Sequence, residues 1–184
     1  MKEQLERSEA KWKILILHHP LYSIKGGNNA IQRWMFDDLV REYGVDLLLQ
    51  GHEHAYARMT AHDKNGCPIA PVYTVSHCSP KNYRIHFDDG FDKFGISSRY
   101  YQTVSVNGDT LAMAAYDAST HALYDSLMII VNPNKSFQWR PIRDLGKDIP
   151  ENLDFTPDPA NKKDRKFASR IEEYKKTHPE RIKR

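Results

Sequence analysis

Apolar residues fall into short runs of strand length, and one helical pattern separates the first two of them. The runs 14–17 and 47–49 are continuous and apolar, as is typical of strands buried on both faces. Between them, Ala30 to Tyr43 carries apolar residues at helical spacing, and Gly44 follows as a stop signal. The predicted buried face of this helix consists of Ile31, Trp34, Met35, Leu39 and Tyr43. The order strand, helix, strand predicts a βαβ unit.

Further strands follow in the second half of the chain. Residues 72–76, 100–106, 111–116 and 126–131 alternate or run apolar at strand length. Asn107-Gly108 is a typical two-residue hairpin turn, which predicts that its flanking strands pair antiparallel. A βαβ unit followed by an antiparallel meander indicates the α/β fold class.

Histidines follow both strands of the βαβ unit. His18 and His19 come directly after the first strand, and His52 and His54 come just after the second. A right-handed crossover makes the two strands parallel, so their carboxyl ends lie at one edge of the sheet. In extended backbone, residues two apart face the same side. Neutral imidazole is a common ligand of first-row divalent metals, so we expect His18, His52 and His54 to converge on a metal site. The alternative for an isolated His-x-His pair is two surface histidines in a loop.

The residues around these histidines resemble those of a known family. Leu17-His18-His19-Pro20, followed by Val45 to Arg58, is similar to the calcineurin-like metallophosphoesterases and, within them, to the purple acid phosphatase branch. The signature of that branch is Gly-His-x-His-x-Tyr-x-Arg. All five of its specified positions are met here, at Gly51, His52, His54, Tyr56 and Arg58.

The resemblance implies a role for each matched residue. His18 and His52 would ligate one metal of a two-metal centre and His54 the other, with His19 beside these ligands. His19, Tyr56 and Arg58 are the candidate catalytic residues. Arg58 would either bind a phosphate oxygen or pair with a nearby carboxylate.

The implied activity is hydrolysis of a phosphomonoester or a related phosphate ester by water activated between two metal ions, iron with zinc, manganese or a second iron. The resemblance implies a four-layer αββα sandwich, of which this chain matches the C-terminal half. Relatives carry Asp-x-His, Gly-Asp and Gly-Asn-His motifs before the matched region, and this sequence contains none of them. We therefore expect the centre to be incomplete in this chain and the N-terminal half of the same enzyme to be its partner. The alternative is a non-catalytic fragment or binding module that retains the second half of the fold.

Composition and charge narrow the classes of function and cellular location that the chain could have. The 184 residues carry a net charge of only +3 with both signs mixed, which gives no argument for nucleic acid as a ligand. No apolar run is long enough for a membrane span, and residues 1–13 lack the apolar core of a signal peptide. The chain is therefore either cytoplasmic or missing its beginning, whereas the resemblance implies an extracellular or periplasmic protein. Cys67 and Cys78 allow either one disulfide or two free thiols.

Three regions are predicted along the chain. Residues 1–134 would form the metallophosphoesterase part, and the proline-rich residues 135–160 an extended linker. Residues 161–184 would form a charged helix that docks through Phe167, Ile171 and Tyr174.

Overall fold

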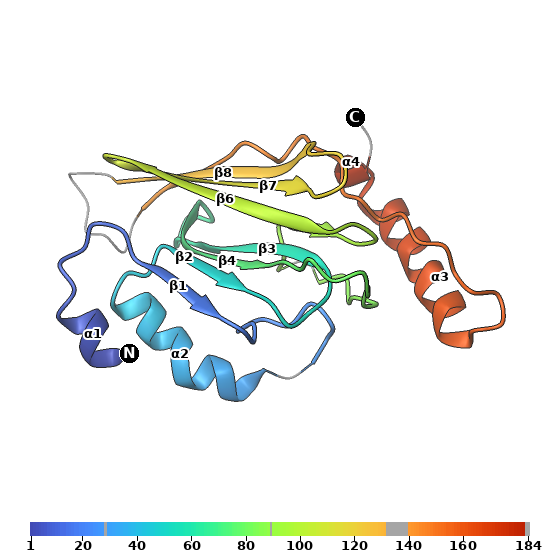
Figure 1. Ribbon diagram of the computed structural model, residues 1–184, viewed down its shortest axis with the longest axis horizontal. Helices are drawn as coiled ribbons and strands as arrows, with labels where there is room; N and C mark the ends of the chain where they lie inside the picture. The colour runs from blue at the N-terminus through green and yellow to red at the C-terminus, as the bar shows by residue number, and fades with distance from the viewer. Residues whose placement is uncertain (28, 89, 132–139, 183–184) are drawn as a thin grey trace.

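A computed structural model describes the protein over residues 1–27, 29–88, 90–131 and 140–182. Two β-sheets are stacked on each other in this structure, with helices beneath the first sheet and at one end (Figure 1). The first sheet has the strand order β1-β2-β4-β3-β5, and the second has the order β6-β7-β8-β9. The strands of the first sheet are β1 (Ile14–Leu17), β2 (Leu47–Gln50), β3 (Tyr56–His62), β4 (Pro68–Val75) and β5 (Lys93–Gly95). Those of the second sheet are β6 (Tyr100–Asn107), β7 (Thr110–Asp117), β8 (Leu123–Ile130) and β9 (Ile142–Asp144). The helices are α1 (Lys2–Glu6), α2 (Ala30–Glu42), α3 (Lys162–Thr177) and α4 (Pro179–Ile182).

The predicted βαβ unit is present. β1 pairs with β2 in parallel register, and α2 forms the connection between them. β2 also pairs with β4 in parallel register. The carboxyl ends of β1, β2 and β4 therefore meet at one edge of the first sheet, which is where the candidate histidines begin.

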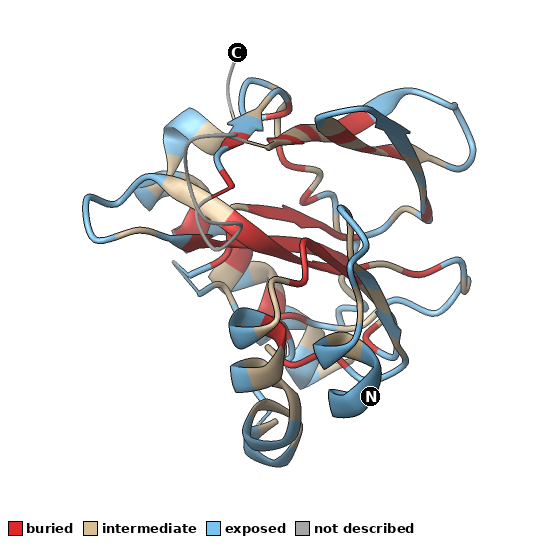
Figure 2. Ribbon diagram, turned by 90° about the vertical axis from the view of Figure 1, so that its left-hand side faces the viewer, coloured by how far each residue is buried: buried red, intermediate tan, exposed pale blue. Residues whose placement is uncertain are grey.

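The first sheet is buried on both faces. Leu47 packs into an apolar cluster with residues of the second sheet, including Leu111, whereas the adjacent Leu48 packs with Val40 of α2. Alternation of neighbouring side chains across a strand explains why β2 is a continuous apolar run. Figure 2 shows these buried strands between the second sheet and the helices.

The C-terminal helix α3 lies at one end of the molecule, whereas α2 lies beneath the first sheet (Figure 1). The buried α3 residues Phe167, Ile171 and Tyr174 pack in one cluster with Val75 of β4, while α2 packs against Tyr73, two positions earlier on that strand. The described residues thus build three layers, helices on sheet on sheet. The α/β fold class with a βαβ unit and an antiparallel meander is confirmed.

The buried face of α2 differs from the prediction. Ile31, Trp34 and Met35 are 70%, 82% and 48% exposed, whereas Val40 is fully buried. Phe36, one turn before Val40, packs against the same cluster. The helix carries two apolar stripes, and spacing within the helix alone does not reveal which stripe the sheet covers.

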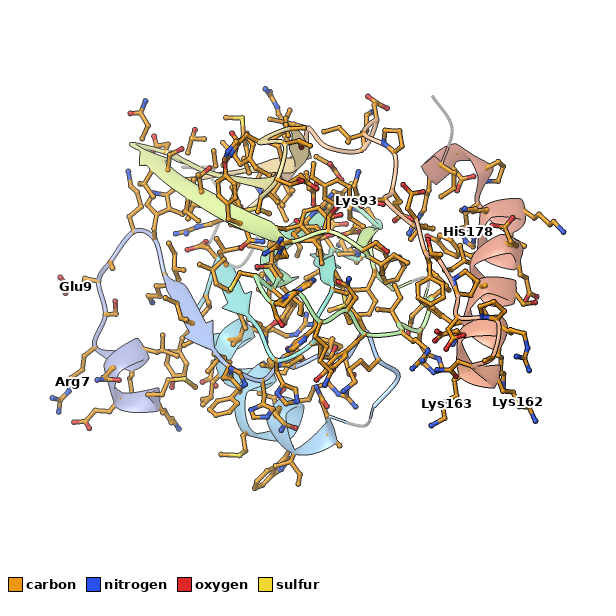
Figure 3. The ribbon with its side chains drawn as sticks, turned by 45° about the vertical axis from the view of Figure 1, so that its right-hand side comes forward. Arg7, Glu9, Lys93, Lys162, Lys163 and His178 are labelled. Carbon is orange, nitrogen blue, oxygen red and sulfur yellow. The ribbon has the colours of Figure 1, made fainter. Side chains whose placement is uncertain are left out.

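The segment predicted as a linker contributes to the body of the protein. Residues 142–144 form β9, which pairs antiparallel with β8, and the buried Arg140 guanidinium binds the Asp46 carboxylate. The first part of that segment, 135–139, lies outside the described residues. The predicted C-terminal helix appears as α3 and the short α4, with Lys162 and Lys163 extending away from the body (Figure 3).

Candidate metal centre

Three strand ends come together at the edge that carries the histidines. His18 follows β1, Gly51 follows β2 and Ser76 follows β4. The Gly51 amide donates to the His18 carbonyl at 3.1 Å, and a Cβ at Gly51 would lie 3.7 Å from that oxygen and 3.9 Å from the Ser76 carbonyl. The topology therefore places histidines from distant parts of the chain side by side.

The imidazoles of His18, His19 and His52 form a single group, here called the three-imidazole group. One nitrogen of each ring lies within 4.8 Å of the corresponding nitrogens of the other two, and all three residues are exposed. His52 Nδ1 is 3.3 Å from His18 Nε2, and the His19 and His52 ring centroids are 4.2 Å apart. Within the described ranges, this is the group of side chains arranged to hold a metal ion.

The turn after β2 depends on His52 rather than on Gly51. His52 has a φ of 66°, in the left-handed region that non-glycine residues seldom adopt. The amide of Glu53 donates to the Gly51 carbonyl at 2.7 Å, so residues 51–55 form tight turns. The extended geometry that would point His52 and His54 to the same side is therefore absent.

His54 lies apart from the three-imidazole group. Its Nδ1 is 2.9 Å from the Lys81 carbonyl oxygen, and its ring stacks on Tyr83 at 4.3 Å and on His77 at 5.7 Å between centroids. Of the three histidines expected to converge, His18 and His52 therefore lie together with His19 beside them, and His54 is outside their group; that His54 ligates the second metal stays a prediction. The reason for the separation is the left-handed turn at His52, which separates the directions of the His52 and His54 side chains.

The carboxylate between these two histidines has a structural role. Glu53 is 3% exposed and accepts hydrogen bonds from Ser23 Oγ at 2.5 Å and from the Ile24 amide at 2.7 Å. It fastens the loop that follows Pro20 to the turn that carries His52. Both of its oxygens therefore serve to hold this loop in place.

Positive charge gathers on the His54 side of this edge. The amino groups of Lys25 and Lys81 lie 4.3 and 5.1 Å from the centroid of the Tyr83 ring, which stacks on His54. Desolvation lowers the pKa of His52, and the neighbouring His19, His18 and Lys25 lower it further. The neutral ring, which is the form that binds metals, is favoured by this environment.

Arg58 is buried between the two sheets and does not face the histidine edge. It is 1% exposed, and its Nε donates to Asp125 at 2.7 Å. Its terminal nitrogens pair with Asp144 at 2.6 Å and with Asp92 at 3.3 Å. Of its two predicted roles, the structure shows the contact with carboxylates. A phosphate in solvent cannot reach this guanidinium.

Tyr56 belongs to the same buried network. It is fully buried and donates its hydroxyl to Asp125 at 2.8 Å. Burial raises the pKa of Tyr56 well above its ordinary value, and Asp125 raises it further. Burial alone disfavours the charged form of Arg58, but Asp125 and Asp144 outweigh it and raise the pKa of the guanidinium. Neither Tyr56 nor Arg58 is therefore placed to contact a substrate directly.

Sequence reasoning missed the aspartates of this network. Asp125 is fully buried on β8 and interacts electrostatically with Lys93 of β5, which is also buried. The signal was a lone carboxylate within an apolar strand pattern, since a buried charge requires a partner.

Comparisons with known proteins show which families this chain is similar to. The family model described as calcineurin-like phosphoesterase matches residues 1–56. An acid phosphatase of Aspergillus ficuum is 36% identical over 64 residues, which are 34% of this chain and 10% of that protein. Purple acid phosphatase 3 of Arabidopsis thaliana is 26% identical over 129 residues, which are 65% of this chain and 33% of that protein.

A solved structure shares the fold. The protein named GAP50, the anchor in the inner membrane complex of Plasmodium, matches with a TM-score of 0.55 at 15% identity. The match covers 73% of this chain and 42% of that one, and at this identity it concerns the fold alone.

The chain is thus similar to the calcineurin-like phosphoesterases, and the relatives named here are acid and purple acid phosphatases. The resemblance predicted from the sequence is confirmed, and the chain is phosphatase-like by that resemblance. It spans a third or less of the length of these two relatives.

Cys67 and Cys78 are both free and exposed. None of the helices that the structure describes has the length and apolar character of a membrane span.

Proposed function

We propose that this chain is part of a metal-dependent hydrolase of phosphate esters of the purple acid phosphatase type. The observation that carries the proposal is the 3.3 Å approach of His52 Nδ1 to His18 Nε2, from two strand ends 34 residues apart in the chain. The similarity to acid phosphatases supports the same activity. The substrate class is a phosphomonoester or a related phosphate ester.

The described residues fit the nitrogen ligands of a two-metal centre but not its carboxylates. Among the side chains that the structure describes, the candidate donors grouped at this edge are all imidazoles. A pair of ions, iron with zinc, manganese or a second iron, would supply an activated water and stabilise charge on phosphate oxygens. In this proposal His18 and His52 would bind one ion, and His54 would bind the other through Nε2 while its Nδ1 stays on the Lys81 carbonyl.

The chain's own residues would prepare the edge for an anionic substrate. Imidazole ligands add no negative charge, and Lys25 and Lys81 add positive charge beside His54. His19 would lie next to the bound phosphate. Tyr56 and Arg58 would act as positioning residues, because their network with Asp125 holds the start of β3 between the sheets, directly after the turn that carries the histidines.

The missing carboxylates require a second segment. β1 lies at the edge of the first sheet, and Ile14 and Ile16 on it are 41% and 75% exposed. An apolar, unpaired edge strand is a site where another strand pairs. We therefore propose that the N-terminal half of the same enzyme docks there and supplies the remaining ligands. By similarity to its relatives, the assembled enzyme would be extracellular or periplasmic.

A second candidate function is a non-catalytic module. The incomplete donor set favours it, since three imidazoles without a carboxylate bind a metal but do not by themselves complete a two-metal hydrolase. This module would retain the fold and hold at most one ion.

Hydrolysis of para-nitrophenyl phosphate separates these two functions. The assay is run on this chain and on a polypeptide that adds the residues encoded upstream, each loaded with iron and zinc. The proposal expects turnover by the longer polypeptide, its loss with a chelator and its loss in the variant His52→Ala. Turnover that survives both the chelator and His52→Ala overturns it. An inactive longer polypeptide that binds one ion supports the non-catalytic module instead.

A further inference from the structure

We infer that His18, His19 and His52 form by themselves a site for one divalent cation that prefers nitrogen ligands, such as Zn²⁺, with His19 as a ligand and His54 outside the site. The proposed function assigns His54 to a metal and leaves His19 beside the ligands. The inference therefore concerns the same edge of the sheet but a different donor set, and it does not depend on hydrolytic activity.

The closest pair of nitrogens has the separation that a tetrahedral ion requires. Zinc binds imidazole nitrogen at about 2.0–2.1 Å, so two ligands on a tetrahedron are about 3.3–3.4 Å apart. His52 Nδ1 and His18 Nε2 are separated by 3.3 Å. These two rings can share one ion with little rearrangement.

His19 completes the set. Its ring is 4.2 Å from that of His52 and 4.9 Å from that of His18, measured between centroids, and the His18 and His19 planes are nearly perpendicular at 88°. All three donor nitrogens fall within 4.8 Å of one another. Because all three side chains are exposed, closing the remaining gap requires only side-chain rotation at the surface. His54 is held outside this group, because its Nδ1 contacts the Lys81 carbonyl and its ring is stacked between Tyr83 and His77, which leaves only Nε2 as a donor and fixes the ring in place.

The donor chemistry selects the class of ion. Three imidazoles without a carboxylate suit zinc, copper, nickel or cobalt, whereas magnesium and calcium require oxygen ligands. Three protein nitrogens also leave the fourth tetrahedral position to solvent or to a small anion such as phosphate. The cation requirement of this site is therefore distinct from that of a centre built on aspartates.

The competing explanation for the short distance is a hydrogen bond. An N–H between His52 and His18 would also hold these nitrogens at 3.3 Å, and His19 would then be a neighbouring surface ring. This explanation predicts no dependence of metal affinity on His19.

Zinc titration of the whole chain decides between the two explanations. Chelator-treated protein is titrated with Zn²⁺ alone by isothermal calorimetry, and Co²⁺ absorption reports the coordination number. We expect one ion per chain with the intense visible bands of four-coordinate cobalt. The variant His19→Ala should lower zinc affinity by at least about tenfold, since even partners outside the metal's own ligands change affinity about 10–100-fold.

Two further variants make the result specific. His54→Ala should lower zinc affinity less than His19→Ala does, and the matched control His62→Ala, at an exposed histidine at the end of β3, should leave it within a factor of about two. Far-ultraviolet circular dichroism confirms that each variant is folded, and His19→Gln replaces His19→Ala if the latter is not. The inference is overturned if the His19 variant binds zinc as tightly as the parent chain, if His54→Ala costs more than His19→Ala, or if no zinc binds. These outcomes do not depend on phosphatase turnover, so failure of the inference and failure of the proposed function remain distinguishable.

Discussion

The eight residues from Gly51 to Arg58 divide into two regions with opposite physical character. His52 lies at the solvent-exposed edge of the first sheet, where its ring meets two other imidazoles. Tyr56 and Arg58 lie between the sheets at 0% and 1% exposure, with every named contact made to aspartates. One short signature therefore contains an exposed half that can bind a ligand and a buried half whose polar groups are bonded to aspartates.

The difference explains why both halves occur together. An exposed imidazole group can exchange water, metal and anion, but it contributes little to holding the sheets in place. A buried guanidinium with three carboxylate partners ties β3 to β8 and β9, and it cannot take part in exchange. Mutations in the two halves should therefore change different observables.

The largest expected effect is on stability, at Arg58. The variant Arg58→Ala leaves the buried Asp125 without its cation, so the free energy of unfolding should fall by about 3–5 kcal/mol. Urea unfolding followed by circular dichroism measures it. The matched control is Arg41→Ala, which breaks the more exposed Arg41–Asp37 pair at 3.2 Å and should cost no more than about 1 kcal/mol. Equal losses in the two variants would show that burial does not distinguish these ion pairs.

A smaller loss is expected at Tyr56. The variant Tyr56→Phe removes the hydroxyl that donates to Asp125 but keeps the ring and the arginine contact, so we expect a loss of about 1–2 kcal/mol. Tyr101→Phe, at a hydroxyl on the exposed side of β6, serves as the control and should change little. A loss at Tyr56 as large as that of Arg58→Ala would mean that the tyrosine, not the arginine, organises the network.

At His52, stability and metal binding should move in opposite directions. Because glycine adopts a positive φ without steric cost, His52→Gly should raise the free energy of unfolding by up to about 1 kcal/mol. The same variant should lose zinc binding. Gly51→Ala is the control: an added Cβ there meets neighbours only at ordinary contact distances of 3.7 Å or more, so stability should hardly change. A clear loss of stability in His52→Gly would place His52 in the structural half of the signature.

The smallest effect concerns pH and lies away from both halves. Hydrogen bonds from Ser119 and from the Thr120 amide lower the pKa of Asp117, the last residue of β7. A carboxylate with a lower pKa in the folded state adds stability above its unfolded value of about 3.9, and that stability is lost as the pH falls further. Urea midpoints measured from about pH 6 downward should therefore decline more in the parent chain than in Asp117→Asn. Equal declines in the two proteins would show that Asp117 does not contribute to the pH dependence of stability.

Much of the fold follows from pattern and topology. The apolar runs 14–17 and 47–49 lie in β1 and β2, and the predicted hairpin joins β6 to β7, with its turn at Gly108-Asp109 because Asn107 pairs with Thr110. The buried face of α2 could not be predicted, because two apolar stripes compete for one sheet and tertiary packing selects between them. β9 was missed for a related reason, since the nearby prolines suggested a linker and a three-residue edge strand carries almost no periodic signal.

The candidate site was predictable as far as topology determines it. Because β1 and β2 are parallel neighbours, His18 and His52 come close together however their side chains are oriented. The separation of His54 from His52 follows a positive φ at His52, and no sequence pattern predicts a left-handed histidine. The burial of Arg58 depends on Asp125, which lies 67 residues further along the chain on another sheet.

Nuclear magnetic resonance of the imidazole rings during zinc addition tests the central claim most directly. The chain is labelled with ¹⁵N at its histidines, and each ring is assigned by substitution. The account predicts that one equivalent of Zn²⁺ shifts the ring nitrogens of His18, His19 and His52 together, while those of His54 remain where they were. A shift of His54 with His18 and His52, and none at His19, would contradict it.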